Sequence, residues 1–466
     1  MIRNLLFILL LSVGSSAFAL VKLPAFFGDN MVLQQNAKVK IWGWGSAGQS
    51  VVVKTSWDEK KYKAKTDENG SWQLWVNTPA AGGPYTLHIS EKNTVVLNNI
   101  LIGEVWICSG QSNMDMPVKG YGNLPIAHSA DLILESPNSN LRLFHVERAY
   151  SDQPQNDVKG NWNVADAQSV ANFSAVGYQF ALMLQKHLGV PVGIIQTTWG
   201  GSPIEAWTDK KVLEDLLGER LKTDRAISKA IHQTPGNLYN AMVRPLEGYA
   251  MAGVIWYQGE QNRHNNSDYL ALQMAMVKDW RKHWNIGDWP FYTVQIAPMN
   301  YGKEPALSLP LLREAQIKLT DSLVNTGMAV SMDVGEEHNI HPANKTPISK
   351  RLAALALTQH YHKPGIAAVG PRYASMQVKA DTITLKFLNT PLGLTSYGKT
   401  LTQFEIAGAD RVFHPAKAKI KDSQVVVFNT EVRNPIAVRY AFKDWIFGEL
   451  YSTEGMPAPP FRTDNW

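Results

Sequence analysis

The segment Gly103-Glu-Val-Trp-Ile-Cys-Ser-Gly-Gln-Ser-Asn-Met-Asp-Met116 is the most informative stretch of the chain. Its apolar and β-branched residues from Val105 to Ile107 predict a buried strand, and Gly110 marks a turn after it. Ser112 follows two residues later, so a tight turn would present its hydroxyl at the carboxyl end of the strand. Because open α/β sheets place their active sites at that edge, we expect Ser112 to be a nucleophile.

Downstream of this segment, strand-like and helix-like patterns alternate. A helix is predicted between the capping residue Ser174 and Gly189, a second from Ser267, and a third over residues 345–362. Buried strands are predicted at residues 192–196, 254–257, 291–297 and 328–332. Alternation of this kind is typical of a mostly parallel sheet covered by helices on both faces, so we expect an α/β fold.

The flanking regions have the short alternating runs of β proteins. Residues 20–100 predict a small β-sandwich, and Asn69-Gly70 predicts a hairpin turn between strands at 61–66 and 72–76. Residues 365–466 predict a second β-rich domain. The expected organisation is therefore a leader at 1–19, a β-sandwich at 20–100, a catalytic domain at 101–364 and a β domain at 365–466.

The charge balance indicates what the protein does not bind. Forty-five basic and 40 acidic residues give the 466-residue chain a net charge of +5, and the basic residues form no long run. A nucleic-acid partner is therefore not expected.

The first residues read as an export signal. A charged start at Arg3 precedes an apolar run over residues 5–13, and Ala17-Phe18-Ala19 fits a cleavage site. The run is shorter than the roughly 20 residues needed to span a bilayer, so we expect a periplasmic or secreted protein without a membrane anchor. Cys108 is the only cysteine, which excludes an internal disulfide, and its apolar neighbours predict a buried thiol.

Three further segments supply groups that a serine hydrolase needs. Gly200-Gly201 follows a predicted strand, and a backbone N–H can approach an oxyanion closely where no side chain intervenes. Gln258 and Asn262 follow another strand, and an amide of either could donate to the same oxyanion. Their spacing does not decide between the two amides.

His341 is the candidate base, because it lies in a loop just after a predicted strand. Asp333 at the strand end is the first candidate for the acid that orients it, and Glu337 is the second. A dyad oriented by a backbone carbonyl is a further alternative. The pair His338-x-x-His341 lacks the His-Glu-x-x-His pattern of zinc hydrolases, so neither a metal nor an organic cofactor is expected.

The chain resembles the sialate O-acetylesterase family of SGNH (GDSL-like) hydrolases over nearly all of its length after residue 19. The resemblance depends on the following motifs: Gly103 to Met114, Trp199-Gly-Gly-Ser-Pro203, Glu205-Ala-Trp207, Tyr239-Asn-Ala-Met242, Trp256-Tyr-Gln-Gly-Glu260, Ile340-His-Pro342 with Lys345 and Arg351-Leu352, and Pro459-Pro-Phe-Arg-Thr463. It implies a flavodoxin-like three-layer α/β/α domain flanked by β-sandwich-like domains.

The resemblance also implies roles for single residues. Ser112 would be the nucleophile and His341 the base, and Gly201 and Asn262 would match the oxyanion donors of the family. The chain departs from its relatives at three positions. Asn339 stands where relatives commonly carry Asp before Ile-His-Pro, and His338 stands where related hydrolases carry an Asp three residues before the His. Gln261 stands where relatives often carry Ser.

The sequence thus predicts a carboxylic ester hydrolase that removes acetyl groups from carbohydrates, with sialate O-acetylesterase as the first interpretation. An esterase of acetylated xylan or xyloglucan is one alternative, and an inactive carbohydrate-binding protein is another. The expected partner is an acetylated carbohydrate, and the sequence does not indicate an oligomeric state.

Overall fold

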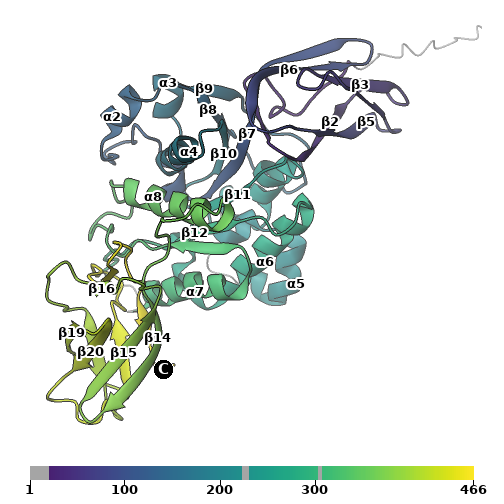
Figure 1. The fold of residues 1–466 in the computed structure, drawn as a ribbon. Helices are drawn as coiled ribbons and strands as arrows, with labels where there is room; N and C mark the ends of the chain where they lie inside the picture. Colours follow the sequence, from purple (N-terminus) through teal and green to yellow (C-terminus); the bar gives the residue numbers. More distant parts are fainter. Residues whose placement is uncertain (1–19, 223–229, 303–306) are drawn as a thin grey trace, which may run out of the picture.

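The computed structural model describes residues 20–222, 230–302 and 307–466, so the predicted leader at 1–19 lies outside the described residues. Figure 1 shows three parts in chain order: a β domain at one end, a central α/β domain, and a second β domain at the other end.

The central domain is built on one sheet whose strands lie in the order β13-β12-β11-β7-β10-β8-β9. All neighbouring pairs are parallel except β8 and β9. The strands are β7 (Thr94–Gly110), β8 (Asn138–His145), β9 (Trp162–Ala165), β10 (Val192–Thr198), β11 (Gly253–Tyr257), β12 (Phe291–Val294) and β13 (Thr326–Ala329).

Helices cover both faces of this sheet (Figure 1). On one face lie α4 (Ala175–Leu188) and α8 (Thr346–Leu355), and on the other lie α5 (Lys210–Leu217), α6 (Asn266–Trp284) and α7 (Ser308–Ser322). The prediction for α4 is confirmed: the Gly177 N–H donates to Ser174 Oγ (3.0 Å), and Gly189 ends the helix with a φ of 69°.

Shorter helical segments connect these elements. They are α1 (Ser112–Asp115), α2 (Ser129–Leu134), α3 (Ala167–Ala171), and 3-10 or π turns at Ile204–Trp207, Gly218–Lys222, Ile231–Gln233, Tyr239–Val243, Arg244–Leu246, Glu260–Asn265 and Ala356–His360.

The strand order reverses at β7. The chain passes from β7 to β8 and β10 on one side and then crosses to β11 on the other side. Ligands of open α/β sheets bind in the crevice at such a switch point, outside the carboxyl ends of the strands. The residues just after β7, among them Ser112, lie at this crevice.

The N-terminal β domain shares β7 with the central sheet. The first half of β7 pairs with β6 and β1, and its second half pairs with β10 and β11. The boundary that the sequence suggests at 100/101 therefore falls within one continuous strand. The other strands are β1 (Val32–Gln34), β2 (Lys38–Trp44), β3 (Ser50–Thr55), β4 (Lys61–Lys65), β5 (Ser71–Asn77) and β6 (Gly82–Ser90).

The predicted hairpin at Asn69-Gly70 is wrong in its pairing. Gly70 lies in a turn with a φ of 77°, but β4 pairs with β3 whereas β5 pairs with β2. The turn therefore joins strands of two different sheets. Local turn chemistry marks where a chain reverses, but it does not determine which strands become partners.

The C-terminal domain consists of antiparallel sheets around an apolar core that also includes Met328, Val330 and Met332 of the central domain. Its strands are β14 (Arg372–Lys379), β15 (Thr382–Leu388), β16 (Leu394–Thr395), β17 (Phe404–Ala407), β18 (Phe413–Pro415), β19 (Lys417–Lys421), β20 (Gln424–Phe428), β21 (Ala437–Tyr440), β22 (Tyr451–Ser452) and β23 (Phe461–Arg462). The predicted fold class, a three-layer α/β/α domain flanked by β domains, is confirmed.

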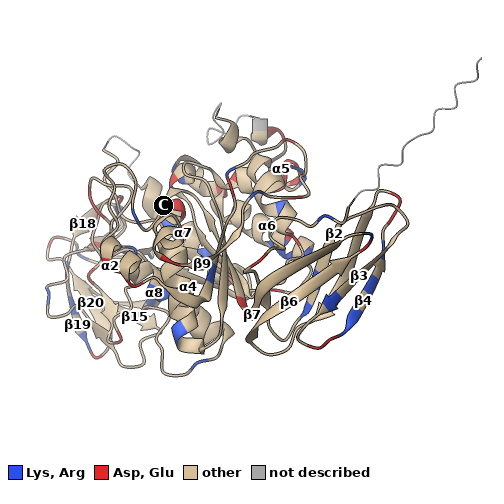
Figure 2. Cartoon of the chain, turned by 90° about the horizontal axis from the view of Figure 1, so that it is seen from above, with Lys and Arg blue, Asp and Glu red and all other residues tan. Residues whose placement is uncertain are grey.

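Two surface properties bear on the kind of partner. Lys and Arg are spread over all three parts and are interspersed with Asp and Glu, as Figure 2 shows. Among the residues that the structure describes, no helix combines the length and hydrophobicity that a membrane span requires.

Candidate active site

Ser112 begins the short helix α1, directly beyond the carboxyl end of β7. Gly110 makes this abrupt turn possible. It has a φ of 132°, and a Cβ atom at this position would lie 2.2 Å from the Tyr257 carbonyl oxygen. Only glycine therefore lets the end of β7 pack this closely on β11. Ser112 is half-buried at this turn.

The side chain of Gln111 fastens the Ser112 turn to the segment that follows β11. Its Oε1 accepts hydrogen bonds from Gln258 Nε2 (3.1 Å), the Gly259 N–H (3.2 Å) and the Gln261 N–H (3.3 Å). Two neighbouring strand ends thus form one hydrogen-bonded unit.

The two glycines after β10 lie beside the candidate nucleophile. A Cβ atom on Gly200 would be 3.3 Å from Ser112 Cβ, so this backbone passes the serine at close range. Gly201 adopts a φ of 72°, and its carbonyl accepts a hydrogen bond from Gln233 Nε2 (2.7 Å). The Gly201 N–H makes no hydrogen bond to another described residue, so it is free to donate to a ligand.

The two candidate amides belong to a buried network. Gln258 Nε2 lies within hydrogen-bond distance of Asn262 Oδ1 (2.7 Å) as well as of Gln111, and Gln258 Oε1 accepts from the Tyr269 hydroxyl (2.8 Å). Asn262 Nδ2 donates to Glu205 Oε2 (2.9 Å) and Oε1 (3.2 Å). In this structure both amides therefore bind protein groups and hold the loops after β10 and β11 together.

His341 lies in the loop between β13 and α8. Its Nε2 atom is buried and has no hydrogen-bond partner among the described residues. Burial, and secondarily the nearby charge of Lys345, lower the pKa of His341 to about 4. The imidazole is therefore neutral at physiological pH, which is the form that accepts a proton.

Asn339 holds the backbone around this histidine. Asn339 Oδ1 accepts the His341 N–H (3.0 Å), and Asn339 Nδ2 donates to the His341 carbonyl (2.9 Å) and to Glu336 Oε2 (2.9 Å). Asn339, which stands where relatives commonly carry Asp, thus positions this loop. An ionised Asp at 339 could not donate the two hydrogen bonds that Asn339 Nδ2 makes.

The structure does not bring the two candidate acids to His341. Asp333 forms a two-fold salt bridge with Arg351, from Oδ1 to Nη1 (2.8 Å) and from Oδ2 to Nη2 (2.7 Å). Glu337 accepts a hydrogen bond from Asn300 Nδ2 (3.2 Å) at the surface. Both carboxylates are therefore held by other partners.

A buried residue that the sequence did not single out links the nucleophile to the base. Asn113, which is 1% exposed, donates from Nδ2 to Glu260 Oε1 (2.6 Å) and to the Ile340 carbonyl (3.0 Å). Its Oδ1 accepts a hydrogen bond from the buried Lys345 Nζ. Because Asn113 follows Ser112 and Ile340 precedes His341, this amide brings the two segments together.

The sequence contained a partial signal for these residues. Asn113, Glu260 and Lys345 all occur in the motifs on which the family resemblance depends, but nothing in their spacing shows that they meet. A buried Lys and a buried Glu need partners, and the Asn113 amide serves both. Among the described residues, no group of three His, Cys, Asp or Glu side chains is arranged to hold a metal ion.

Comparisons with known proteins identify the family of this chain. Residues 102–358 match the model of the family described as carbohydrate esterase, sialic acid-specific acetylesterase. The chain belongs to this family. It is therefore an esterase, and it hydrolyses O-acetyl esters of carbohydrates.

Similar proteins extend the match to almost the whole chain. The human sialate O-acetylesterase is 27% identical over 515 residues, which cover 99% of this chain and 96% of the relative. The rat sialate O-acetylesterase is 26% identical over 512 residues, which cover 94% of each. The crystal structure of a carbohydrate acetylesterase from Xanthomonas citri is 34% identical, with a TM-score of 0.87 and coverage of 96% of this chain and 100% of that chain.

Proposed function

We propose that this esterase works through an acyl-enzyme formed on Ser112, with His341 as the base. The observation that carries this proposal is the Asn113 amide, which joins the segment of Ser112 to that of His341 beside an imidazole nitrogen without a partner. A serine hydroxyl becomes nucleophilic when such a base removes its proton.

In the first half of the reaction, Ser112 Oγ attacks the acetyl carbonyl carbon while His341 accepts the hydroxyl proton. The negative charge that develops on the carbonyl oxygen is stabilised by the Gly201 N–H. The C–O bond to the sugar then breaks, and His341 returns its proton to the sugar oxygen, which leaves as an alcohol. In the second half, His341 deprotonates water, which attacks the acetyl-serine carbonyl carbon. The bond to Ser112 Oγ then breaks, acetate is released, and His341 returns its proton to Ser112 Oγ.

Asn262 and Gln258 have different proposed parts in this step. Asn262 Nδ2 also lies 3.2 Å from Asn265 Oδ1, and a small rotation would direct one N–H from that acceptor to the oxyanion. Gln258 Nε2 lies within hydrogen-bond distance of Gln111 Oε1, the Ser202 carbonyl and Asn262 Oδ1, which belong to three different segments, so its proposed part is to hold these segments together.

We assign no hydrogen-bonded acid to His341. Asp333, the first candidate from the sequence, is bound at both oxygens by Arg351, and its proposed role is to fix the end of the His341 loop on α8. The imidazole is positioned by its backbone, through Asn339 and Asn113, and the pair Ser112–His341 acts as a dyad.

Hydrolysis of 4-nitrophenyl acetate tests the mechanism. Ser112→Ala and His341→Ala should each lower kcat by about three orders of magnitude or more, with unchanged circular dichroism. Mass spectrometry of acid-quenched wild-type enzyme should show an acetyl group on the peptide that contains Ser112. Full activity of a folded Ser112→Ala variant would refute the assignment.

For the sugar, we propose O-acetylated sialic acid as the first candidate, because the curated relatives that resemble the whole chain carry that name. Acetylated xylan or xyloglucan is the alternative. Acetate release from O-acetylated sialic acid and from acetylated hemicellulose, measured under the same conditions, separates the two.

We also propose that residues 1–19 direct export to the periplasm or the medium. The sequence of these residues supports the proposal. N-terminal sequencing of the protein recovered from the periplasm should begin at or near Leu20, and recovery of the uncleaved chain from the cytoplasm would contradict the proposal.

A further inference from the structure

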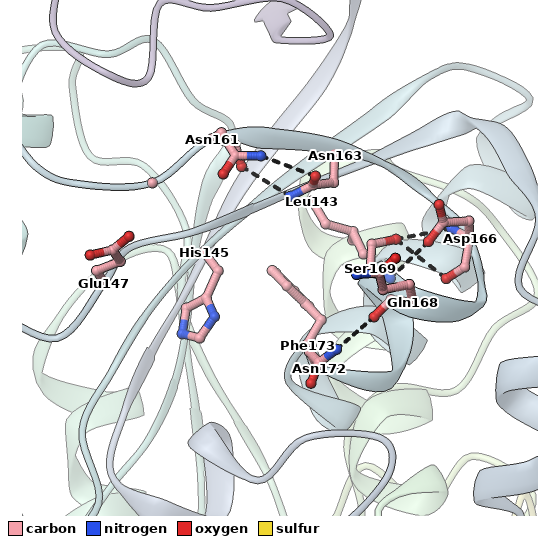
Figure 3. Close-up of a pocket in the computed structure, with 11 residues that line it drawn as sticks. Leu143, His145, Glu147, Asn161, Asn163, Asp166, Gln168, Ser169, Asn172 and Phe173 are labelled. Carbon is pink, nitrogen blue, oxygen red and sulfur yellow. Dashed lines mark hydrogen bonds between the residues drawn. The ribbon is translucent and has the colours of Figure 1, made fainter.

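A cavity of about 380 Å³ lies at the carboxyl end of β8, beside α3 (Figure 3). Its volume falls within the range of small-ligand sites, roughly 300–1,000 Å³. It does not contain Ser112 or His341, and the mechanism above does not use it.

The cavity combines an apolar floor with polar walls. Leu143 and Phe173 are buried, and their side chains line its base. The walls carry the exposed side chains of His145, Asn161 and Gln168, and Figure 3 shows the rings of His145 and Phe173 below the amides of Asn161 and Asn163. Such a surface suits a sugar, whose C–H groups pack on apolar atoms while its hydroxyls bind planar amides.

The walls have unused hydrogen-bonding capacity. Asn161 Nδ2 donates to Asn163 Oδ1 (3.0 Å). The side-chain oxygen of Asn161, Oδ1, accepts no hydrogen bond from a described residue. The Gln168 amide and the Glu147 carboxylate likewise make no side-chain hydrogen bond within the described part of the chain. These groups are exposed to solvent and can bind hydroxyl groups of a ligand.

The sheet register relates the cavity to the strand that leads to the nucleophile. Gln196 of β10 is level with Cys108 of β7 on one side and with His145 of β8 on the other. His145 is therefore two strand spacings, about 10 Å, from β7, at the same edge of the sheet as Ser112. A short oligosaccharide spans such a distance.

Two contacts connect the cavity wall to α1. Arg148, next to Glu147, forms a salt bridge with Asp115 of α1. On the other side the Phe173 carbonyl accepts the Val118 N–H (2.9 Å), just beyond α1. The cavity and the nucleophile thus share their supporting segments.

We propose that this cavity is a subsite for a neutral sugar unit of the glycan whose acetylated unit lies at Ser112. The inference rests on the proposed function and adds to it a second recognition site. The lining contains the carboxylates of Glu147 and Asp166 and no Lys or Arg, so it disfavours a sugar that carries a carboxylate. The catalytic site recognises the ester, and the subsite recognises the chain to which the ester is attached.

The test compares an acetylated monosaccharide with a tetrasaccharide in which the same acetylated sugar is joined to three neutral sugar units. The acetylated sugar is the one that the wild-type enzyme deacetylates fastest. The KM of the wild-type enzyme for the tetrasaccharide should be at least several-fold lower than its KM for the monosaccharide. His145→Ala and Gln168→Ala should each reduce this preference by about 3- to 10-fold, as expected for the loss of one or two hydrogen bonds. A uronic acid in place of the neutral sugar next to the acetylated unit should also reduce the preference for the tetrasaccharide.

His187→Ala is the matched control, because His187 is an exposed histidine in the last turn of α4, at the opposite edge of the sheet. This variant should keep the wild-type preference. Equal KM values for the two sugars, or an unchanged preference in both subsite variants, would overturn the subsite. Failure of the proposed function would instead appear as hydrolysis of 4-nitrophenyl acetate that does not require Ser112.

Discussion

Replacing Asn113 by Ala is expected to affect both stability and catalysis. The substitution removes three hydrogen bonds, to Glu260 Oε1, the Ile340 carbonyl and Lys345 Nζ. Glu260 is 4% exposed and Lys345 is 2% exposed, so water cannot readily replace the lost partner. Each buried polar group without a partner costs about 1–3 kcal/mol.

For three such groups, the free energy of unfolding should fall by roughly 3–9 kcal/mol, against a total of about 5–15 kcal/mol for a typical domain. The activity should fall separately, because Asn113 holds the segment of His341 against that of Ser112. A displacement of about 1 Å between reacting groups can cost on the order of 10²-fold in rate.

Urea unfolding followed by tryptophan fluorescence measures the first effect, and kcat for 4-nitrophenyl acetate at low urea measures the second. Gln273→Ala is a suitable control. Gln273 is a buried amide on α6 with one side-chain hydrogen bond, to Thr293 Oγ1 (3.2 Å), so its loss should lower stability by about 1–3 kcal/mol and leave kcat unchanged. An Asn113→Ala variant with wild-type stability, or one that is destabilised but fully active, would refute this reasoning.

Three further predictions follow from single groups. Because burial lowers the pKa of His341 to about 4 and the neutral ring is the base, kcat/KM should be retained as the pH falls below neutrality and be half-lost near pH 4; a midpoint near its ordinary value of 6.5 would contradict this. Asp333→Asn should destabilise the protein by about 3–5 kcal/mol in urea unfolding, through the loss of its ion pair with Arg351. It should lower kcat by less than about 10-fold, whereas a loss near 10⁴-fold would identify Asp333 as the acid that serves His341. Burial raises the pKa of the Cys108 thiol far above its ordinary value, so a disulfide reagent should titrate about one thiol per chain in urea and almost none in the native protein; rapid native labelling would show that the strand opens.

The sequence predicted those features that local chemistry determines. The strand before Ser112, the caps of α4 and the alternation of strands and helices all depend on neighbouring residues, and the structure confirms them. Pairing between distant segments was not predicted. β4 and β5 flank a turn but belong to different sheets, and β7 continues through an expected domain boundary, because the sheets on both sides of that boundary share its backbone.

The same limit applies within the site. Asp333 follows a strand, as a catalytic acid would, but Arg351 lies within reach on α8 and pairs with both of its oxygens. Gln258 and Asn262 were expected as donors to an oxyanion because their position after a strand is right. Which amide hydrogens remain free depends on Glu205, more than 50 residues away in sequence, and no spacing rule contains that information.

The position of the nucleophile is determined by the contact between two strand ends. Gly110 lets the turn after β7 approach the Tyr257 carbonyl, and Gln111 Oε1 then accepts the N–H groups of the turn after β11. The bond from Gln261 uses its backbone N–H, so the replacement of the Ser common in relatives by Gln leaves this bond intact. The turn can therefore vary in its side chain at 261 without moving Ser112, whereas Gln111 and Gly110 cannot change without doing so.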